Sequence, residues 1–274
     1  MRELGAALFG KHVMRAYTND DEIRDLLSDF VGRVVAAGHR TVIFLDADSD
    51  DLAAALARAA AGAAPGQYSA LYFGTSQTGS FGGPLFSVDD KLAALGGIAA
   101  DALAAGWPAV SVAGEMVWTR RAGWTPSDLL AYETRVNRLF GDPRVTSLCL
   151  YDRRAFGKEL LLRVGAVHPG PLLGFTLGGW GAHLRLSGEL DASNAGSLPS
   201  ILDLVADADS VVLLDASDLD FVDAAGAGTI VRFAASRPSR HTVVRCGRGV
   251  RQALQLVGAE SVPSLVLRDR VPGV

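Results

Sequence analysis

His12, Cys149 and His168, which all lie in the first 170 residues, have side chains suited to nucleophilic or metal chemistry. A thiolate becomes a strong nucleophile when a neighbouring histidine accepts its proton, and thiolate and imidazole groups also bind metal ions. The three residues are far apart in the sequence, so only the tertiary fold could bring them together. The alternative is structural, because a cysteine in a buried strand usually packs as a small hydrophobic residue. A histidine before a proline usually lies in a loop.

Glu115 is a second candidate for a binding site, because it follows the apolar run 109–112, which is typical of a buried strand. A carboxylate at the carboxyl end of a parallel strand lies at the edge where α/β sheets bind ligands. Trp118 and Trp124 follow closely and could form the wall of an apolar pocket. The alternative is that Glu115 caps a helix and that Trp118 is a core residue.

The short motifs of the common catalytic sites are absent from the sequence. A phosphate-binding loop needs G-x-x-x-x-G-K-[ST], but none of the three lysines follows a glycine-rich turn after a strand. The Gly/Ser-rich segment 74–87 has no lysine and no G-x-G-x-x-G dinucleotide motif. The nucleophile motif G-x-S-x-G and the zinc motifs C-x-x-C and H-E-x-x-H are also missing. We therefore predict a protein that is not an enzyme and that has no cofactor and no metal ion.

The chain has 274 residues, enough for one large domain or two small ones. Its hydrophobic fraction of 49% is sufficient for ordinary cores, and its net charge of −4 argues against a basic nucleic-acid-binding protein. Two cysteines cannot form a disulfide scaffold. Residues 1–15 lack the apolar segment of a secretory signal, and no apolar run is long enough to span a membrane. These features predict a soluble, cytoplasmic protein.

Apolar periodicity indicates alternating helices and strands in the first domain. Residues 19–37 carry the stripe of an amphipathic helix, with Asn19 or Asp20 as its cap. Short continuous apolar runs are typical of strands that are buried on both faces of a parallel sheet. The expected strands are 41–45, 70–73, 109–112 and 145–151, and the further helices are 50–61, 89–105, 127–140 (capped by Ser127) and 153–164. This alternation predicts a mostly parallel α/β sheet.

The segment His168-Pro169-Gly170-Pro171 marks a domain boundary, because two prolines and a glycine stop any helix. We therefore expect one domain at residues 1–170 and a smaller α/β domain at residues 171–274. The smaller domain's expected elements are a hairpin over 175–190 with Gly178-Gly179 at its turn, helices at 192–206, 222–236 and 249–258, and strands at 210–215, 241–245 and 264–267. Nine acidic residues between Glu189 and Asp223 form either an ordinary solvated surface or an acidic docking face.

Five motifs of the first domain occur in the order and spacing of a known family. They are His-x-x-x-x-Tyr from His12, Gly114-Glu115-Met116-Val117-Trp118, Tyr132-Glu133 with Asn137, Leu148-Cys149-Leu150-Tyr151-Asp152, and His168-Pro169. Residues 10–170 thereby resemble the MEDS domain (methanogen/methylotroph, DcmR sensory domain). The resemblance implies a RecA/KaiC-like core without its nucleotide-binding loop, and the sensing of an unknown small molecule. The ligand-pocket residues that it implies are His12, Glu115, Trp118, Tyr132, Glu133, Cys149 and His168.

The second domain also carries family motifs, which are Leu186-Ser187-Gly188-Glu189-Leu190-Asp191, Leu213-Leu214-Asp215 and Phe221-Val222-Asp223-Ala224-Ala225-Gly226-Ala227-Gly228. Residues 172–269 resemble a STAS domain (sulfate transporter and anti-sigma factor antagonist). The resemblance implies that the domain binds an anti-sigma kinase of the GHKL type. The partner-binding residues that it implies are Asp191, Asp223, Ala224, Ala225, Gly226 and Gly228.

The phosphoacceptor of the switching STAS domains is missing from this sequence. In those domains a serine at the position of Ala225 accepts phosphate at a helix N-terminus, where the added charge changes docking. Ala224 and Ala225 have no hydroxyl group, so we expect no phosphorylation at this position. Control would then come from the sensor domain or from the amount of protein. Asp223 either caps the helix or contacts the partner directly.

The two resemblances imply a bacterial signalling regulator that senses a small-molecule or stress signal and binds an anti-sigma kinase. The alternative is a non-catalytic scaffold subunit of a stress-signalling assembly, with other STAS proteins or a second copy of this chain as partners. A third possibility is an enzyme with Cys149 as nucleophile and His12 or His168 as base. We expect no nucleic acid as a partner, because the sequence has no helix-turn-helix and no basic stripe, and we expect no membrane as a partner either.

Overall fold

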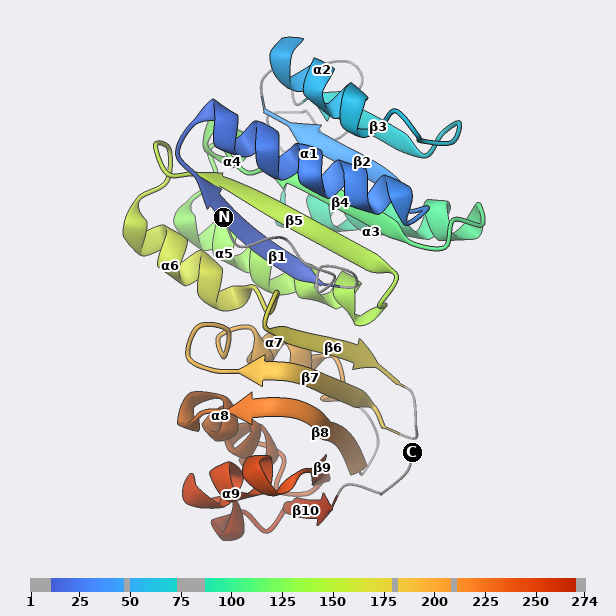
Figure 1. Cartoon of the computed structure of the whole chain (residues 1–274). Helices are drawn as coiled ribbons and strands as arrows, with labels where there is room; N and C mark the ends of the chain where they lie inside the picture. The colour runs from blue at the N-terminus through green and yellow to red at the C-terminus, as the bar shows by residue number, and fades with distance from the viewer. Residues whose placement is uncertain (1–10, 47–49, 73–86, 179–181, 208–210, 270–274) are drawn as a thin grey trace.

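The computed structural model describes residues 11–46, 50–72, 87–178, 182–207 and 211–269. These residues form two α/β units that lie one above the other, each with its own sheet (Figure 1). Strands alternate with helices through the first unit, and a mixed sheet with helices forms the second. The structure therefore confirms the mostly parallel α/β fold and the separate, smaller α/β unit that the sequence predicts.

The first sheet has the strand order β1-β5-β4-β2-β3, and every strand pair in its described residues is parallel. The strands are β1 (His12–Tyr17), β2 (Arg40–Leu45), β3 (Tyr68–Tyr72), β4 (Val110–Glu115) and β5 (Val145–Asp152). Periodicity does not reveal β1, because HVMRAY mixes polar and apolar residues. This strand lies at the edge of the sheet, where it pairs with β5, and its Val13 also forms an isolated bridge with Gly170.

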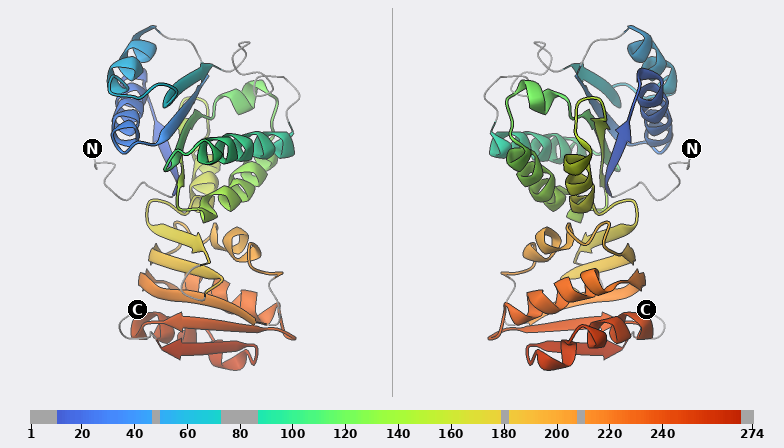
Figure 2. Two further views of the ribbon diagram at one scale, coloured as in Figure 1. Left: turned by 90° about the vertical axis from the view of Figure 1, so that its right-hand side faces the viewer. Right: turned by 90° about the vertical axis from the view of Figure 1, so that its left-hand side faces the viewer.

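Helices cover both faces of the first sheet (Figure 2). One face carries α1 (Asp20–Ala36) and α2 (Asp50–Ala59), whose residues Phe30 and Leu56 are fully buried against it. The helices of the opposite face are α3 (Val88–Ala104), α5 (Pro126–Arg135) and α6 (Lys158–Val167), with the short helix α4 (Trp118–Arg121) and the 3-10 helix η3 (Val136–Gly141). The predicted loop 74–87 lies outside the described residues except for Ser87, which caps α3.

Side-chain caps mark the beginnings of α1, α3 and α5 in the first unit. Asn19 caps α1, as the sequence predicts. The prediction of Ser127 as the cap of the next amphipathic helix is wrong, because Pro126 already occupies the first turn of α5. Thr125 is the cap, and it forms a capping box with Asp128. α5 therefore begins one residue earlier than expected.

Two predicted helices start later than expected, because carboxylates hold the preceding backbone in turns. The Asp152 carboxylate accepts the backbone N–H of Arg154, and α6 begins only after this turn. In the second unit, Oδ1 of Asp191 accepts the backbone N–H of Ser193 at 2.8 Å. The helix expected over 192–206 is consequently reduced to α7 (Leu198–Asp203).

The second sheet has the order β10-β9-β8-β7-β6, with β6 antiparallel to β7 and the other pairs parallel. Its strands are β6 (Leu173–Leu177), β7 (Leu184–Leu190), β8 (Val211–Val222), β9 (His241–Cys246) and β10 (Leu265–Asp269). Besides α7, the helices are α8 (Ala224–Ala235), α9 (Arg248–Leu256) and the 3-10 helix η4 (Ala259–Ser261). β8 runs seven residues beyond its predicted end at residue 215, with register shifts against β7.

The hairpin predicted over 175–190 is formed by β6 and β7. Gly178 has a φ of +75°, a backbone conformation that glycine adopts without strain. Gly179, the second residue of the predicted turn, lies outside the described residues.

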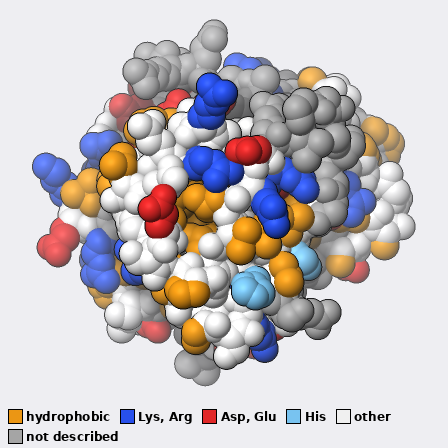
Figure 3. All heavy atoms as spheres, turned by 90° about the horizontal axis from the view of Figure 1, so that it is seen from below, with side chains coloured by type: hydrophobic (Ala, Val, Ile, Leu, Met, Phe, Trp, Pro, Cys, Tyr) orange, Lys and Arg blue, Asp and Glu red, His pale blue; other side chains and the backbone are white. Residues whose placement is uncertain are grey.

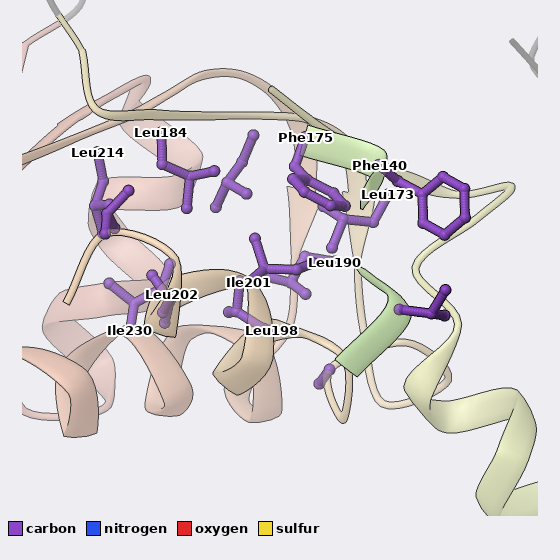
Figure 4. Packing of buried hydrophobic residues seen from close by; sticks show 14 of the residues in the cluster. Phe140, Leu173, Phe175, Leu184, Leu190, Leu198, Ile201, Leu202, Leu214 and Ile230 are labelled. Carbon is purple, nitrogen blue, oxygen red and sulfur yellow. The ribbon is translucent and has the colours of Figure 1, made fainter. Parts of the chain in front are cut away.

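The hydrophobic core continues from one unit into the other. Leu184 and Leu214 of the second sheet pack over helices α7 and α8 (Figure 4). Phe140 of η3, which belongs to the first unit, lies in the same cluster as Leu173 and Phe175 of β6 (Figure 4). The two units are therefore packed against each other as well as joined by the chain.

The surface at the far end of the second unit is mixed in character. Lys/Arg and Asp/Glu side chains alternate there with small groups of hydrophobic side chains (Figure 3). No helix of the described residues combines the length and the apolar character needed to cross a membrane.

Candidate functional site

Four side chains from separate segments meet on the α5 face of the first sheet. They are His12 of β1, Glu133 of α5, Cys149 of β5 and His168, which directly follows α6. β1 and β5 are neighbouring parallel strands, and α5 and α6 lie beside them (Figure 1). All four residues are buried, and their ligand atoms lie within 4.8 Å of one another. The fold therefore brings together His12, Cys149 and His168, as nucleophilic or metal chemistry would require.

The Glu133 carboxylate links the members of this buried cluster. Its Oε2 atom lies 3.1 Å from Nε2 of His12 and 3.4 Å from Nε2 of His168. The same oxygen lies 3.8 Å from Sγ of Cys149, which is itself 3.3 Å from Nε2 of His12. The other oxygen, Oε1, accepts a hydrogen bond from the Tyr151 hydroxyl. Two imidazoles and a thiol thus converge on one carboxylate oxygen.

Both imidazole rings are held through their outer nitrogen, Nδ1. In His168 this atom is 2.8 Å from the backbone carbonyl of Val164, which can only accept, so Nδ1 carries the proton. In His12 it is 2.9 Å from Oδ1 of Asn137. The Asn137 amide is oriented by its Nδ2 group, which donates to the carbonyl of Val167 at 3.0 Å. In the neutral rings, both Nε2 atoms therefore direct a lone pair into the cluster.

Burial controls the protonation of the cluster. Desolvation, supported by the nearby His12, lowers the pKa of His168 to about 4, so this imidazole is neutral at pH 7. Desolvation and the Glu133 carboxylate raise the pKa of the Cys149 thiol well above its usual value. Desolvation favours a higher pKa for Glu133, but the positive charge that the imidazoles carry when protonated, the hydrogen bond with His12 and the Tyr151 hydroxyl outweigh it and hold that pKa below its usual value. The thiol therefore keeps its proton, which makes it a poor nucleophile.

Tyr151 and Asn137 also belong to the site, although in the sequence they stand out only as parts of motifs. Tyr151 is two residues after Cys149 on β5, so both side chains point to the same face of the sheet. Asn137 is four residues after Glu133, the spacing that places two residues on the same side of a helix. These two spacings are the sequence signals by which both residues could be found.

Glu115 lies on the opposite face of the first sheet, away from the buried cluster. Along β4, Val112 belongs to the core on the α5 face and Ala113 to the core on the α1 face, so Glu115 points toward α1. Its carboxylate accepts the Tyr17 hydroxyl at 2.9 Å and the backbone N–H of Asp46 at 2.7 Å. The two carboxylate oxygens thus connect the carboxyl ends of β1, β2 and β4. In this structure Glu115 therefore holds the ends of these strands together.

Trp118 and Tyr132 lie in an aromatic group next to the cluster. The ring centroids of Trp118 and Trp124 are 4.9 Å apart, and those of Trp124 and Tyr132 are 5.6 Å apart. Nζ of Lys91 lies 4.5 Å from the Trp118 ring centroid and 5.0 Å from that of Phe44, which are cation–π distances. Desolvation lowers the pKa of Lys91 to about 7. Trp118 and Trp124, which could have lined a ligand pocket, therefore pack in an aromatic core that also contains the buried Lys91 side chain.

Comparison with known families identifies both units. Residues 11–169, more than half of the chain, match the model of the MEDS family, the methanogen/methylotroph, DcmR sensory domain. The chain belongs to the MEDS family. Residues 174–267 match the model described as Mlab, STAS domain. No curated protein matches the chain. A MEDS domain followed by a STAS domain supports a signalling regulator of the anti-sigma-factor-antagonist type, and the buried cluster lies entirely in the MEDS domain.

The STAS motif gathers at the start of α8. Asp223 caps this helix through Oδ1, which accepts the backbone N–H of Gly226 at 2.9 Å. Its Oδ2 atom accepts the backbone N–H of Ala192 at 2.9 Å. Ala224 and Ala225 are exposed in the first turn of the helix. Asp223 thus has the capping role that the sequence leaves open, while the two alanines face solvent.

The remaining residues predicted to bind a partner differ in exposure. Gly226 is buried, and a Cβ atom added to it would lie 2.5 Å from Cγ of Leu190. Asp191 and Gly228 are partly exposed. Phe221, which belongs to the STAS motif but not to the residues predicted to bind a partner, is 51% exposed and precedes the start of α8 in the chain. An exposed aromatic ring next to exposed alanines is the apolar feature of this surface.

Proposed function

We propose that the MEDS domain senses a small molecule and that the STAS domain reports its binding to an anti-sigma kinase of the GHKL type. The observation that carries this proposal is the position of Asn137 between the buried cluster and the STAS domain. Its Oδ1 atom lies 2.9 Å from Nδ1 of His12, and its Nδ2 group lies 3.4 Å from Oγ of Ser200 on α7. One side chain thus contacts both domains, so a change at the cluster reaches α7 directly.

A groove at the domain junction supports the sensing step. It has a volume of about 490 Å³, and its lining comes from both domains. Leu161, Leu162 and His168 line it from the MEDS domain, and Ser193 and Asn194 line it from the STAS domain. Its mainly aliphatic wall suits a small apolar molecule that carries one polar group. A ligand in this groove would contact both domains, and it would shift the equilibrium between two arrangements of the domains by the difference between its affinities for them.

The segment that lines the groove continues to the STAS motif. Ser193 and Asn194 line the groove, and the preceding residue, Ala192, donates its backbone N–H to Asp223 at the start of α8. A ligand in the groove would therefore act on the helix cap within a few residues. Because Ala225 has no hydroxyl group that could accept phosphate, partner binding must be controlled in another way. This path would supply that control.

The surface at the start of α8 supports the binding of a protein partner. We define it as the docking face, formed by the exposed residues Phe221, Ala224 and Ala225 and bordered by the carboxylates of Asp220 and Asp223. An apolar centre with a charged rim is the usual anatomy of a protein interface. The negative rim favours a partner that presents basic groups.

The protonated, buried thiol of Cys149 supports a non-catalytic role. Burial and the Glu133 carboxylate keep the thiol pKa high, whereas a catalytic cysteine needs a lowered one. We therefore propose that the chain transmits a signal without catalysing a reaction.

Direct binding of the purified full chain to the GHKL-type anti-sigma kinases of the same bacterium tests the proposal. We expect one kinase to bind, and we expect Phe221→Asp to weaken the binding at least tenfold. Leu256→Asp is the matched control, because Leu256 is an exposed leucine on α9 (82% exposed) that lies outside the docking face, and its replacement should leave the binding unchanged. Equal affinity of the Phe221 variant and the wild type would refute the docking face.

The sensing step is tested by repeating the titration with a panel of small alcohols, thiols and carboxylates. We expect at least one compound to change the affinity for the kinase. A kinase affinity that none of the compounds alters would argue against a ligand-controlled switch. Self-association of the chain without kinase binding, measured by sedimentation, would instead favour the scaffold alternative.

A further inference from the structure

We propose that His12, Glu133, Cys149 and His168 bind one Zn²⁺ ion in a closed, four-coordinate site. The inference concerns metal binding alone, so it does not depend on the kinase or the small molecule proposed above. Each residue contributes one ligand atom, and the four atoms converge within 4.8 Å of one another. The ligands come from four separate segments, which explains why no short metal motif is present in the sequence.

Four of the six distances between the ligand atoms are close to the edges of a tetrahedron around zinc. Zn–N and Zn–O bonds of about 2.0 Å and a Zn–S bond of about 2.3 Å separate N and O ligands by about 3.3 Å, and either from sulfur by about 3.5 Å. Oε2 of Glu133 is 3.1 Å from His12 Nε2 and 3.4 Å from His168 Nε2. Sγ of Cys149 is 3.3 Å from His12 Nε2 and 3.8 Å from the carboxylate oxygen. Small side-chain movements suffice to complete the coordination.

The orientation of the imidazoles points to a cation between them and the carboxylate. Nε2 of His168 is buried and has no hydrogen-bond partner among the described residues. Because Nδ1 of this ring donates to Val164, Nε2 turns a lone pair toward the Glu133 oxygen, which is also an acceptor. Two acceptors 3.4 Å apart in a buried site repel each other unless a positive charge lies between them.

The contacts on the far side of each ring are those that metal-binding histidines use. Such histidines donate their second ring N–H to a carbonyl, a carboxylate or water, which fixes the ring and its tautomer. His168 has the Val164 carbonyl in this role, and His12 has the Asn137 amide oxygen. The Tyr151 hydroxyl holds the Glu133 oxygen that does not face the cluster centre. Three of the four ligands are thus oriented before a metal ion arrives.

The donor set selects the kind of ion. Thiolate and imidazole ligands favour zinc and other transition metals over Mg²⁺ and Ca²⁺, which take oxygen ligands. One thiolate and one carboxylate carry two negative charges, which a divalent ion neutralises inside the protein. On binding, the S–H bond of Cys149 breaks, its electron pair forms the Zn–S bond, and the proton passes to solvent. Four buried protein ligands leave no open position, which is typical of structural zinc sites.

An ion at this site would affect the segment that connects the two domains. His168 is the last residue before the segment that leads into the STAS domain, and it also lines the junction groove. A bound ion would therefore fasten this segment to β1, β5 and α5. Because the unfolded chain does not hold the four ligands together, binding would stabilise the folded protein.

The test uses the purified full chain, stripped of metal with a chelator and titrated with Zn²⁺ and with Co²⁺. We expect one ion per chain, a rise of several degrees in the melting temperature, and release of protons to the buffer. Bound Co²⁺ should show the intense visible absorption of a tetrahedral site and a thiolate-to-cobalt charge-transfer band. No bound ion, or unchanged melting and no cobalt absorption, would overturn the proposal in favour of a cluster held by hydrogen bonds alone.

Matched variants locate the ion. Cys149→Ser should abolish the charge-transfer band, whereas Cys246→Ser, which changes the buried cysteine of the STAS domain, should leave it intact. His168→Gln should weaken Co²⁺ binding at least tenfold, whereas His241→Gln, at an exposed histidine, should not. If the cluster variants fail to fold, the Cys246→Ser protein still decides the matter. Its only cysteine is then Cys149, and a missing charge-transfer band in this protein would refute the site.

Discussion

Nδ1 of His12 lies 2.9 Å from Oδ1 of Asn137, a residue 125 positions further along the chain. This contact ties the first strand of the MEDS domain to η3, the element that packs against the STAS domain. The same amide donates to the Val167 carbonyl at 3.0 Å and reaches Oγ of Ser200 at 3.4 Å. Asn137 thus connects the buried cluster, the end of α6 and the STAS domain.

Replacing Asn137 with alanine should therefore destabilise the protein more than any single contact would suggest. The variant leaves Nδ1 of His12 and the carbonyl of Val167 without their partner in a buried region, and each lost partner costs about 1–3 kcal/mol. We expect Asn137→Ala to lower the free energy of unfolding by about 2–4 kcal/mol in urea titrations of metal-free protein. Ser200→Ala is the control and should cost less than about 1.5 kcal/mol. Equal effects of the two changes would show that the amide does not carry the connection.

Two glycines of α8 should respond in opposite directions to replacement by alanine. A Cβ atom at Gly226 would lie 2.5 Å from Cγ of Leu190, a fully buried side chain that has no room to move. At Gly228 the nearest atom is Nη1 of Arg232, 3.2 Å away at the end of a flexible side chain. We expect Gly226→Ala to destabilise by about 1–3 kcal/mol through overpacking. Gly228→Ala should stabilise by up to about 1 kcal/mol through helix propensity.

Thermal and urea unfolding of the two alanine variants would measure this difference. A stabilised Gly226 variant would contradict the close packing of α8 on β7. A destabilised Gly228 variant would mean that the Arg232 side chain is held more firmly than its exposed position indicates.

Local sequence patterns account for most of the fold, because helix stripes, apolar strands and turn residues act over short distances. They do not reveal β1, whose mixed sequence is placed by pairing with β5. They also misplace the start of α6, because a carboxylate–backbone contact at Asp152 extends the turn before it. Periodicity therefore mispredicts the first and last residues of elements whose boundaries depend on such side-chain contacts.

The candidate site is only partly predictable for a related reason. Motif resemblance names the four residues of the buried cluster together with others, but it does not say which of the named residues meet. Cys149 and Glu115 lie on neighbouring strands, β5 and β4, yet the alternation of side chains along those strands sends them to opposite faces of the sheet. The prediction of no metal ion rests on missing short motifs, and such motifs cannot report four ligands from four segments.

Lys91 should make the stability of the protein depend on pH between neutral and alkaline conditions. Burial lowers its pKa to about 7 in the folded protein, from an ordinary value of 10.5. Between these two values the unfolded chain binds more protons than the folded chain, so the free energy of unfolding rises with pH. The penalty for burying the charge is complete below pH 7 and disappears as the pH approaches 10.5. The slope contributed by one group is at most about 1.4 kcal/mol per pH unit.

Urea titrations between pH 7 and pH 10 would measure this slope. Lys91→Met should remove it and should stabilise the protein at pH 7, because methionine fills the aromatic site without a charge. Lys158→Met, at an exposed lysine of α6, should keep the slope of the wild type. A Lys91→Met variant with the wild-type slope would assign the pH dependence to other groups.

Introducing a hydroxyl group at Ala225 tests the proposed kinase partner, because it should place the STAS domain under phosphate control. Ala225 is exposed in the first turn of α8, so serine fits there without a clash and leaves the unphosphorylated docking face unchanged. A phosphate at this position adds about −1.5 to −2 charges next to the carboxylates of Asp220 and Asp223. We expect the partner kinase to phosphorylate the Ala225→Ser protein, as judged by mass spectrometry, and to bind the product at least tenfold more weakly. Ala224→Ser is the control, since the neighbouring position should not be modified. Phosphorylation of both variants, or of neither, would show that this helix start is not recognised in the manner of a switching STAS domain.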